Sequence, residues 1–380
     1  MRIVIAPQGF KGSLGPWEAA RAIQQGTNKV FPNAETVLIP VADGGNGTLE
    51  VLVGEDYGSY LHTQVSGPLD EKILASWGIM NDKNTVVIES AQACGLTLLS
   101  TKLRDPLKTT SRGVGELIKS VIEMGYRNIV LGVGGTATND GGVGMAQALG
   151  IRFFDKYGQD LPSGGGPVIG LKSIDFSGLD PRVAESEITV ALDVLNPLCG
   201  PEGATKVYGP QKGADPTSIV VLEKGLERLS TVIDQTYGID TGDFPGAGSG
   251  GGLGAGLKVF LGARCVPGGQ LICERLNIYN QLDGADLVIV GEGSIDYQTM
   301  YGKAPMVVAS YSVALGIPVL GISGKLGLNH EALYQNGFNW LASINDLGVG
   351  EDNSMKFASH FLELATGEAL QRIKSFIPKH

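Results

Sequence analysis

Polar side chains that could act on phosphate stand in a glycine-rich loop, GVGGTATNDGG, at residues 132–142. The loop follows an apolar run and precedes a helical pattern. Glycines there let backbone N–H groups converge on an anion, and a helix N-terminus adds partial positive charge. Thr136, Thr138, Asn139 and Asp140 add hydroxyl, amide and carboxylate groups that suit a phosphate and its metal ion. A tight strand-to-helix connection explains the glycines as readily, but polar caps explain only some of these side chains.

Acidic residues follow three other apolar runs: Asp43 in VADGGNGT, Asp193 in ALDVLNPLCG, and Glu292 with Asp296 in VIVGEGSID. At the carboxyl edge of a parallel sheet, such residues stand where open α/β folds bind ligands. Carboxylate oxygens hold Mg²⁺, which typically uses one or two of them together with substrate phosphates. Asp193 could instead be a general base for a hydroxyl, and turn or helix caps remain the alternative.

Two lysines lie in glycine-containing segments, Lys11 in APQGFKGS and Lys212 in GPQKGA. They are candidates to neutralise phosphate charge, although most lysines are solvated surface residues. A third segment, residues 245–257, contains the spacing GxGxxG. Because no convincing strand precedes it and no βαβ unit surrounds it, close packing or a mobile lid is favoured over dinucleotide binding. The sequence has no GxxxxGK[ST], which excludes a Walker phosphate loop.

The elements that must position these residues alternate between short β-branched runs and amphipathic helical patterns. This alternation predicts an α/β fold with strands buried on both faces. Strands are predicted at residues 2–6, 36–41, 286–290, 318–322 and 340–344, with helices at 16–30, 305–315 and 330–335. These strands would form one doubly wound sheet built from both chain ends.

The middle of the chain predicts a second, inserted domain of mixed α/β type. Runs at residues 62–65, 73–79 and 85–89 predict antiparallel hairpins before a helix at 113–124. Further strands are predicted at 128–133 and 188–193, and helices at 218–237 and 253–261. The predicted limits place residues 1–68 with 285–380 in the first domain and residues 69–284, which carry the glycine-rich loop, in the second.

The charge and residue composition of the chain argue against several classes of binding partner. The formal net charge is −10, which argues against binding to nucleic acid or to an anionic membrane, since both select clustered lysine and arginine. No apolar run approaches bilayer length, and the N-terminus runs directly into a predicted strand, so no targeting or membrane-spanning segment is expected. The scattered cysteines fit a reduced, cytoplasmic location. The four cysteines show no CxxC spacing, and the four histidines show no metal or triad spacing.

Taken together, the motifs resemble those of the class I glycerate kinase family, nearly from end to end. The matching segments are PVADGG at 40–45, SRGVGELI at 111–118, GVGGTATNDGG at 132–142, DVLNPLCGPEGA at 193–204, GPQKGA at 209–214, PGAG at 245–248 and GEGSID at 291–296. The resemblance implies phosphorylation of D-glycerate by ATP with Mg²⁺, in bacteria usually at the 2-hydroxyl. It also implies two α/β domains, one of them flavodoxin-like, with the site in the cleft between them.

Carried onto this sequence, the resemblance assigns a role to each motif residue. We expect Asp193, Lys11 and Lys212 to be catalytic. The residues expected to hold the phosphates of ATP are Gly134, Gly135, Thr136, Thr138 and Asn139. Those expected to bind substrate are Asp43, Gly44, Gly45, Arg112, Asn196 and Ser294, and those expected at Mg²⁺ are Asp43, Asp193, Glu292 and Asp296. The expected partners are the small substrate and ATP, in a monomer or a homodimer.

Four positions depart from the family pattern. Gln8 and Gly9 replace the usual aspartate and serine, Asn46 replaces a glutamate, and Ser294 replaces an arginine. If that arginine orients a carboxylate substrate, this chain could prefer another hydroxy acid or a polyol. Three hypotheses therefore stay open: a glycerate kinase, a kinase of the same family with a different small hydroxylated substrate, and a catalytically silent nucleotide or metabolite binder.

Overall fold

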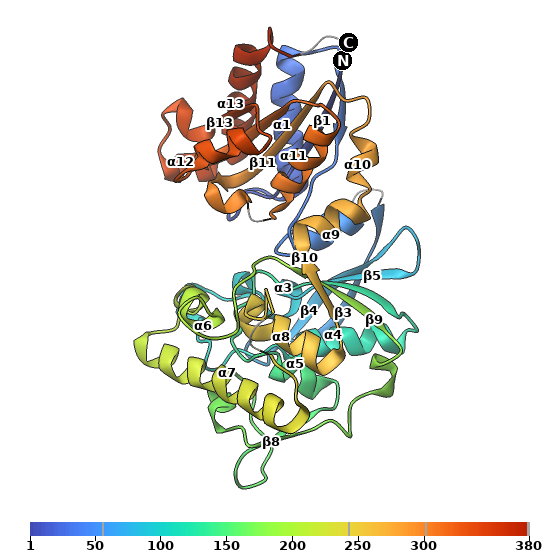
Figure 1. Ribbon diagram of the computed structural model, residues 1–380, viewed down its shortest axis with the longest axis vertical. Helices are drawn as coiled ribbons and strands as arrows, with labels where there is room; N and C mark the ends of the chain where they lie inside the picture. The colour runs from blue at the N-terminus through green and yellow to red at the C-terminus, as the bar shows by residue number, and fades with distance from the viewer. Residues whose placement is uncertain (55–56, 242–243, 301, 378–380) are drawn as a thin grey trace. The chain divides into compact units, whose positions relative to one another are not determined.

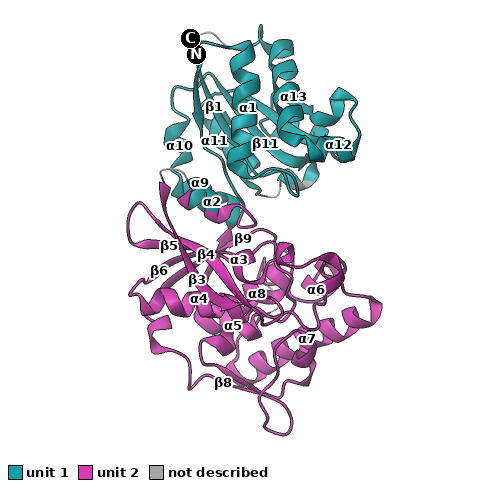
Figure 2. Cartoon of the chain, turned by 180° about the vertical axis from the view of Figure 1, so that it is seen from behind, with its two compact units in different colours: residues 1–43, 50–52, 268–380 teal, residues 44–49, 53–267 magenta. Residues whose placement is uncertain are grey.

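The computed structural model describes residues 1–54, 57–241, 244–300 and 302–377. The chain divides into two compact units, which Figure 2 colours separately. Unit 1 contains residues 1–43, 50–52 and 268–380, and unit 2 contains residues 44–49 and 53–267. Both units contain helices and parallel strands, so the predicted α/β class is confirmed.

The limits of these units differ from the predicted domain limits at 68/69 and 284/285. Strand β3 (Gly58–Ser66) pairs along its whole length with β4 (Lys72–Met80) in the sheet of unit 2. Helix α9 (Gly268–Arg275) packs on α11 (Ala304–Ala314) of unit 1. Both contacts join a segment to a partner that local sequence patterns do not identify.

The sheet of unit 1 is formed from both ends of the chain (Figure 1). Its strands are β1 (Arg2–Pro7), β2 (Glu35–Leu38), β11 (Leu287–Ile295), β12 (Val319–Leu326) and β13 (Trp340–Ser343). They lie in the order β13-β12-β11-β1-β2, and every pair is parallel. This is the flavodoxin-like order, in which the strand order reverses at β1 and β11. The prediction of a doubly wound sheet is confirmed.

Helices complete unit 1. They are α1 (Pro16–Val30), α9, α10 (Ile278–Gln281), α11, α12 (Glu351–Lys356) and α13 (Ala358–Ile373), with 3₁₀ turns η7 (Tyr297–Met300), η8 (His330–Asn336) and η9 (Ile344–Leu347). Helix α1 has the predicted bounds because Pro16 fits its first turn and the Glu18 carboxylate accepts a hydrogen bond from Gly15 N. Residues 330–335 form a 3₁₀ turn. Helix α13, which was not predicted, packs against α1.

The sheet of unit 2 mixes parallel and antiparallel strands. Beside β3 and β4 it contains β5 (Thr85–Glu89), β6 (Asn128–Gly132), β9 (Glu187–Leu192) and β10 (Arg264–Pro267), in the order β10-β9-β6-β5-β4-β3. Strands β3, β4 and β5 are antiparallel neighbours, which confirms the predicted hairpins, and the remaining pairs are parallel. A separate two-stranded ribbon, β7 (Arg152–Phe154) with β8 (Ser173–Asp175), was not predicted.

Helices and turns cover this second sheet. They are α3 (Ala91–Cys94), α4 (Arg112–Glu123), α5 (Val143–Ala148), α6 (Ala204–Tyr208), α7 (Pro216–Tyr237) and α8 (Ser249–Leu261), with 3₁₀ turns η2 (Leu96–Leu98), η3 (Thr101–Leu103), η4 (Gly166–Gly170), η5 (Pro181–Val183) and η6 (Pro210–Lys212). Helix α2 (Thr48–Val53) crosses the limit between the units. Across the residues that the structure describes, we find no helix with the length and hydropathy of a membrane span.

Three parallel strands of unit 2 end beside one another. Glu89 of β5 pairs with Gly132 of β6, and Gly132 pairs with Ala191 of β9. The segments that follow these strands therefore begin at one edge of the sheet, where ligands bind in open α/β folds. Two of them are the glycine-rich loop and the segment that begins with Asp193.

Candidate active site

The glycine-rich loop after β6 is packed against the segment 44–46 and against Asp193. Gly134 N donates a hydrogen bond of 3.0 Å to Gly44 O. A Cβ atom on Gly134 would stand 2.5 Å from Gly45 Cα and 2.6 Å from Asp193 Oδ2. Gly135 has a φ of +74°, and a Cβ there would stand 1.9 Å from Asn46 Oδ1. The structure thus brings together predicted residues from three distant segments, and it requires glycine for that packing.

Replacing Gly134 with alanine is expected to disturb activity through Asp193. The added Cβ would displace the Asp193 carboxylate or the Gly45 backbone, and overpacking of this kind costs about 1–3 kcal/mol of stability. We expect a fall in kcat of at least about tenfold, because small displacements at a reacting centre are costly. The control is Gly170→Ala, where a Cβ meets no atom within 4 Å. Equal kcat values for the two variants would contradict the placement of Gly134 at the site.

Lys212 lies in η6 and is only 3% exposed. Its Nζ donates to Thr136 Oγ1 at 3.2 Å and to Thr138 O at 2.7 Å, so the ammonium is held against the glycine-rich loop. Burial lowers the pKa of Lys212 to about 8, although the charges of Asp193 and Asp140 oppose this shift. A mostly protonated, water-shielded ammonium beside a glycine-rich loop can neutralise phosphate charge strongly.

This lowered pKa predicts a pH dependence of stability. Between pH 8 and the ordinary lysine value of 10.5, the unfolded chain keeps a proton on Lys212 that the folded chain has lost. The free energy of unfolding therefore gains a positive slope with pH in this window, because the unfolded state binds more protons. We expect chemical denaturation at pH 7.5 and 9.5 to show this gain in the wild type but not in Lys212→Met. An identical pH slope for both proteins would contradict the burial of a titrating Lys212.

Asp193 follows β9 and is half-buried. Its Oδ1 accepts a hydrogen bond of 2.6 Å from the Ser249 hydroxyl at the start of α8, while Oδ2 lies toward the bare Cα of Gly134. The segment around Ser249 is held by contact with the glycine-rich loop. Gly251 has a φ of +74°, and a Cβ there would stand 2.0 Å from Thr138 O. The sequence left close packing or a mobile lid open for residues 245–257. This contact shows close packing.

Asn139 and Asp140 belong to the internal framework of the loop. Both are 1% exposed. Asn139 Nδ2 donates to Thr205 Oγ1 at 3.0 Å, and Asp140 Oδ2 accepts 2.8 Å hydrogen bonds from the backbone N and the hydroxyl of Ser111. Burial raises the pKa of Asp140, and these hydrogen bonds oppose the rise. The binding of phosphate by Asn139 stays a prediction.

Two further predicted substrate ligands in unit 2 have local partners. Arg112, in the first turn of α4, forms an ion pair of 3.4 Å with Glu116. Asn196 Nδ2 donates to Glu202 O at 2.8 Å, and its Oδ1 accepts a 2.7 Å hydrogen bond from the Tyr208 hydroxyl. Burial, followed by the charge of Asp193, raises the pKa of Tyr208 to about 12. Tyr208 thus donates a hydrogen bond to Asn196 and also lies near enough to Asp193 for that charge to act on its pKa.

Unit 1 carries a second polar group, formed by the second half of β11 and the segment between β11 and α11. Glu292 is 5% exposed; its Oε1 accepts a hydrogen bond of 2.6 Å from the Thr299 hydroxyl, and its Oε2 lies 3.0 Å from Lys303 Nζ. Burial raises the pKa of Glu292. Burial alone would lower the pKa of Lys303, but Glu292, Asp43 and Asp296 raise it above its ordinary value. Lys303 therefore stays charged and partly neutralises the acidic residues of this sheet edge.

Sequence reasoning did not identify Thr299 or Lys303. Lys303 is the N-cap residue of α11, a helix that was predicted, so its position between an acidic strand-end loop and a helix was the available signal. The predicted residues nearby are placed as follows. Lys11 is exposed, and its backbone N approaches Gly293; the Ser294 hydroxyl donates to Asp296 Oδ2 at 3.5 Å.

The carboxylates can be compared with the needs of Mg²⁺. The described residues contain no group of three histidine, cysteine, aspartate or glutamate side chains suited to a metal ion. Mg²⁺ bound with a nucleotide needs only one or two carboxylates, because phosphates and water supply its other ligands. The half-buried Asp193 fits that donor set. Glu292 fits it less well, since each of its oxygens already accepts a hydrogen bond.

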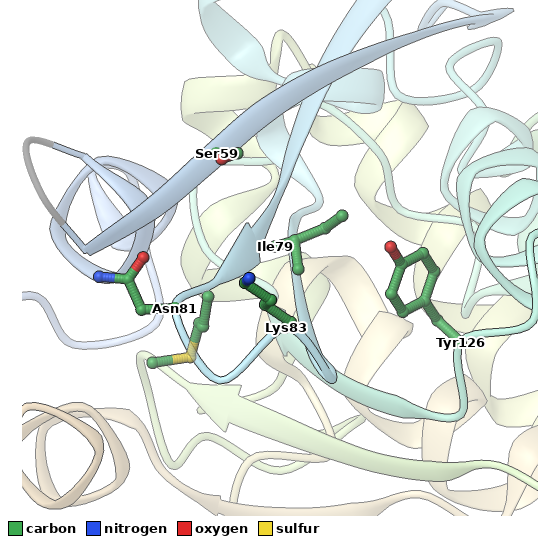
Figure 3. A pocket seen from close by; sticks show the side chains of 6 residues that line it. Ser59, Ile79, Asn81, Lys83 and Tyr126 are labelled. Carbon is green, nitrogen blue, oxygen red and sulfur yellow. The ribbon is translucent and has the colours of Figure 1, made fainter.

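A cavity of about 310 Å³ lies elsewhere in unit 2 (Figure 3). Its lining residues are Ser59, Ile79, Met80, Asn81, Lys83 and Tyr126. None of them is a predicted site residue.

Comparison with known proteins supports one family. The pattern of the glycerate kinase family matches residues 3–374. The chain is 46% identical to glycerate 2-kinase of Escherichia coli (strain K12) over 344 residues, or 90% of each chain. It is 43% identical to a glycerate kinase of Halalkalibacterium halodurans over 363 residues, or 96% of each chain. A crystal structure described as a candidate glycerate kinase 2 from Salmonella typhimurium LT2 is 41% identical, covers 99% of each chain and has a TM-score of 0.81. The chain belongs to the glycerate kinase family.

Proposed function

We propose that this chain transfers the γ-phosphoryl group of ATP to the 2-hydroxyl of D-glycerate in a Mg²⁺-dependent reaction. The observation that carries the proposal is the buried Lys212, whose ammonium contacts Thr136 and the Thr138 carbonyl within the glycine-rich loop. A lysine loses hydration on burial, so its placement beside a polar loop is costly unless a ligand uses the charge. The names of the relatives, glycerate kinase and glycerate 2-kinase, indicate the acceptor.

The proposed roles follow from phosphoryl transfer, which depends on positioning and charge neutralisation more than on covalent chemistry. Because Gly134 N already donates to Gly44 O, the backbone N–H of Gly135 and the Thr136 hydroxyl would bind the phosphates, and Lys212 would neutralise the charge of the transferring group. Asp193 would accept the proton of the attacking hydroxyl or orient it. Its Oδ1 accepts a hydrogen bond from the Ser249 hydroxyl, which helps to fix the direction of the carboxylate.

Mg²⁺ would neutralise the phosphate oxygens of the nucleotide and support charge developing during transfer. Asp193 is the residue of unit 2 whose chemistry and exposure suit a ligand to that ion. Asp43 and Asp296 remain proposed ligands of either the ion or the hydroxyl in unit 1. Lys11, which is exposed in the turn that follows β1, is proposed to bind anionic groups of the ligand.

A second function, phosphorylation of a different small hydroxylated compound, is favoured by one observation. The Gln8 Oε1 atom is buried and accepts no hydrogen bond from any described residue. Gln8 stands at the end of β1, where the strand order of unit 1 reverses, and where the family pattern has an aspartate. A substrate with an additional hydroxyl or amino donor would satisfy this oxygen.

The test is ADP release with ATP and Mg²⁺ across D-glycerate, L-glycerate, and a panel of other hydroxy acids and polyols. Turnover on D-glycerate with the highest kcat/KM supports the proposal. A higher kcat/KM on another compound supports the second function. Nucleotide binding without turnover on any compound would make the chain a silent binder and contradict both.

A further inference from the structure

Lys303 is a cation of unit 1 that an ion pair with a buried carboxylate holds in place. Its Nζ lies 3.0 Å from Glu292 Oε2, and the other oxygen of that carboxylate is held by the fully buried Thr299 hydroxyl at 2.6 Å. The Glu292 side chain is 7% exposed and the Lys303 side chain is 28% exposed. The carboxylate is therefore an internal anchor, whereas the ammonium is partly open to solvent.

The ammonium of Lys303 has hydrogen-bonding capacity left after this contact. It carries three N–H donors, and Glu292 is its one acceptor among the residues that the structure describes. The N-terminus of α11 begins at Lys303, which adds partial positive charge at the same place. Both features favour an anionic group as the ligand of Lys303.

The surroundings of Lys303 specify more than an anion. Asp43 and Asp296 are near enough to act on its charge, and both are half-buried at the carboxyl edge of the sheet. Ionised carboxylates only accept hydrogen bonds, so they suit hydroxyl groups rather than a second anion. A small hydroxy acid has one carboxylate and one or more hydroxyls: its carboxylate can accept from the N–H donors of Lys303 that Glu292 does not use, and its hydroxyls can donate to Asp43 or Asp296.

We propose that Lys303 binds the carboxylate of the acceptor substrate and thereby makes the enzyme select hydroxy acids over neutral polyols. Glu292 and Thr299 act through Lys303, as positioning residues that fix the direction of its ammonium. This inference rests on the proposed function, because it names the recognition element for the acceptor. It assigns no role to Lys303 in binding ATP.

The experiment compares steady-state kinetics of Lys303→Met, Lys303→Arg and the wild type, with D-glycerate and with glycerol as the neutral analogue. We expect Lys303→Met to raise the KM for D-glycerate about 30-fold or more, since a charge-assisted hydrogen bond is lost. The KM for ATP should change by less than about threefold. Lys303→Arg should recover most of the affinity for D-glycerate, and the preference for D-glycerate over glycerol should fall in Lys303→Met.

The matched control is Lys29→Met, which also breaks a lysine–glutamate pair of unit 1, between Lys29 and Glu363. It should leave both KM values unchanged. If Lys303→Met does not fold, Lys303→Gln replaces it, because an amide can still donate to Glu292 but carries no charge. A KM for D-glycerate within about threefold of the wild type, or equal losses for D-glycerate and ATP, overturns the inference. Lack of wild-type turnover on D-glycerate would instead overturn the proposed function.

Discussion

We expect Asp193→Asn to lower kcat about 10³-fold, with little change in the KM for ATP. The substitution keeps the size of the side chain, and its amide oxygen can still accept the hydrogen bond from Ser249. What it removes is the negative charge and the basicity of the oxygen that lies toward Gly134. A positioned general base typically contributes about 10²–10⁴-fold to the rate, and the loss of a metal ligand would act in the same direction.

The control for Asp193→Asn is Asp160→Asn. Asp160 is an exposed aspartate of the same unit, paired with Arg152 at 2.7 Å, and its loss should leave kcat unchanged. Thermal unfolding of both variants separates a loss of chemistry from a loss of structure. If Asp193→Asn retained more than about a tenth of wild-type kcat, Asp193 would be neither the base nor a required ligand.

Lys212→Met should lower kcat about 10²–10³-fold, because it removes a preorganised charge from a water-shielded position. The same substitution should not lower the melting temperature. Methionine has a similar length and no desolvation cost, and the hydrogen bonds lost to Thr136 and Thr138 are offset by the removal of a buried charge. A residue that contributes to activity while it reduces stability is characteristic of a functional site.

Lys224→Met provides the comparison, since Lys224 is exposed on α7 and should affect neither property. The two measurements are kcat with saturating D-glycerate and ATP, and the melting temperature by calorimetry. A Lys212→Met protein that melts well below the wild type and keeps its kcat would show that Lys212 is a structural residue.

Much of the fold was predictable because its strands are short, β-branched and buried on both faces. Strand β5 and helix α1 have their predicted bounds, since Thr85–Glu89 is a continuous buried run and Pro16 marks a helix start. The limit predicted at residue 68 depended instead on which strand β3 would pair with. Such pairing is nonlocal, and a local pattern does not contain it. The three-residue strands of the β7–β8 ribbon are too short to show a period.

The sequence could predict only those site residues that directly follow a buried strand. The glycine-rich loop and Asp193 follow buried strands, so their common edge could be expected, and the structure places them in contact. The contact between Lys212 and Thr136 joins residues that are 76 positions apart, and a local sequence pattern does not predict contacts between such distant positions. Lys303 was missed because a single lysine before a helix resembles any solvated lysine until its partner Glu292 is seen.

The central claim is that this chain places a phosphoryl group on the 2-hydroxyl of D-glycerate, and the most direct test is the identity of the product. The protein is incubated with ATP, Mg²⁺ and D-glycerate, and the position of the phosphate is read from phosphorus–proton coupling in the NMR spectrum. Our account predicts coupling to the single proton on carbon 2, with one ADP formed for each phosphorylated product. Coupling to the two protons on carbon 3, or no phosphorylated product from D-glycerate, would contradict it.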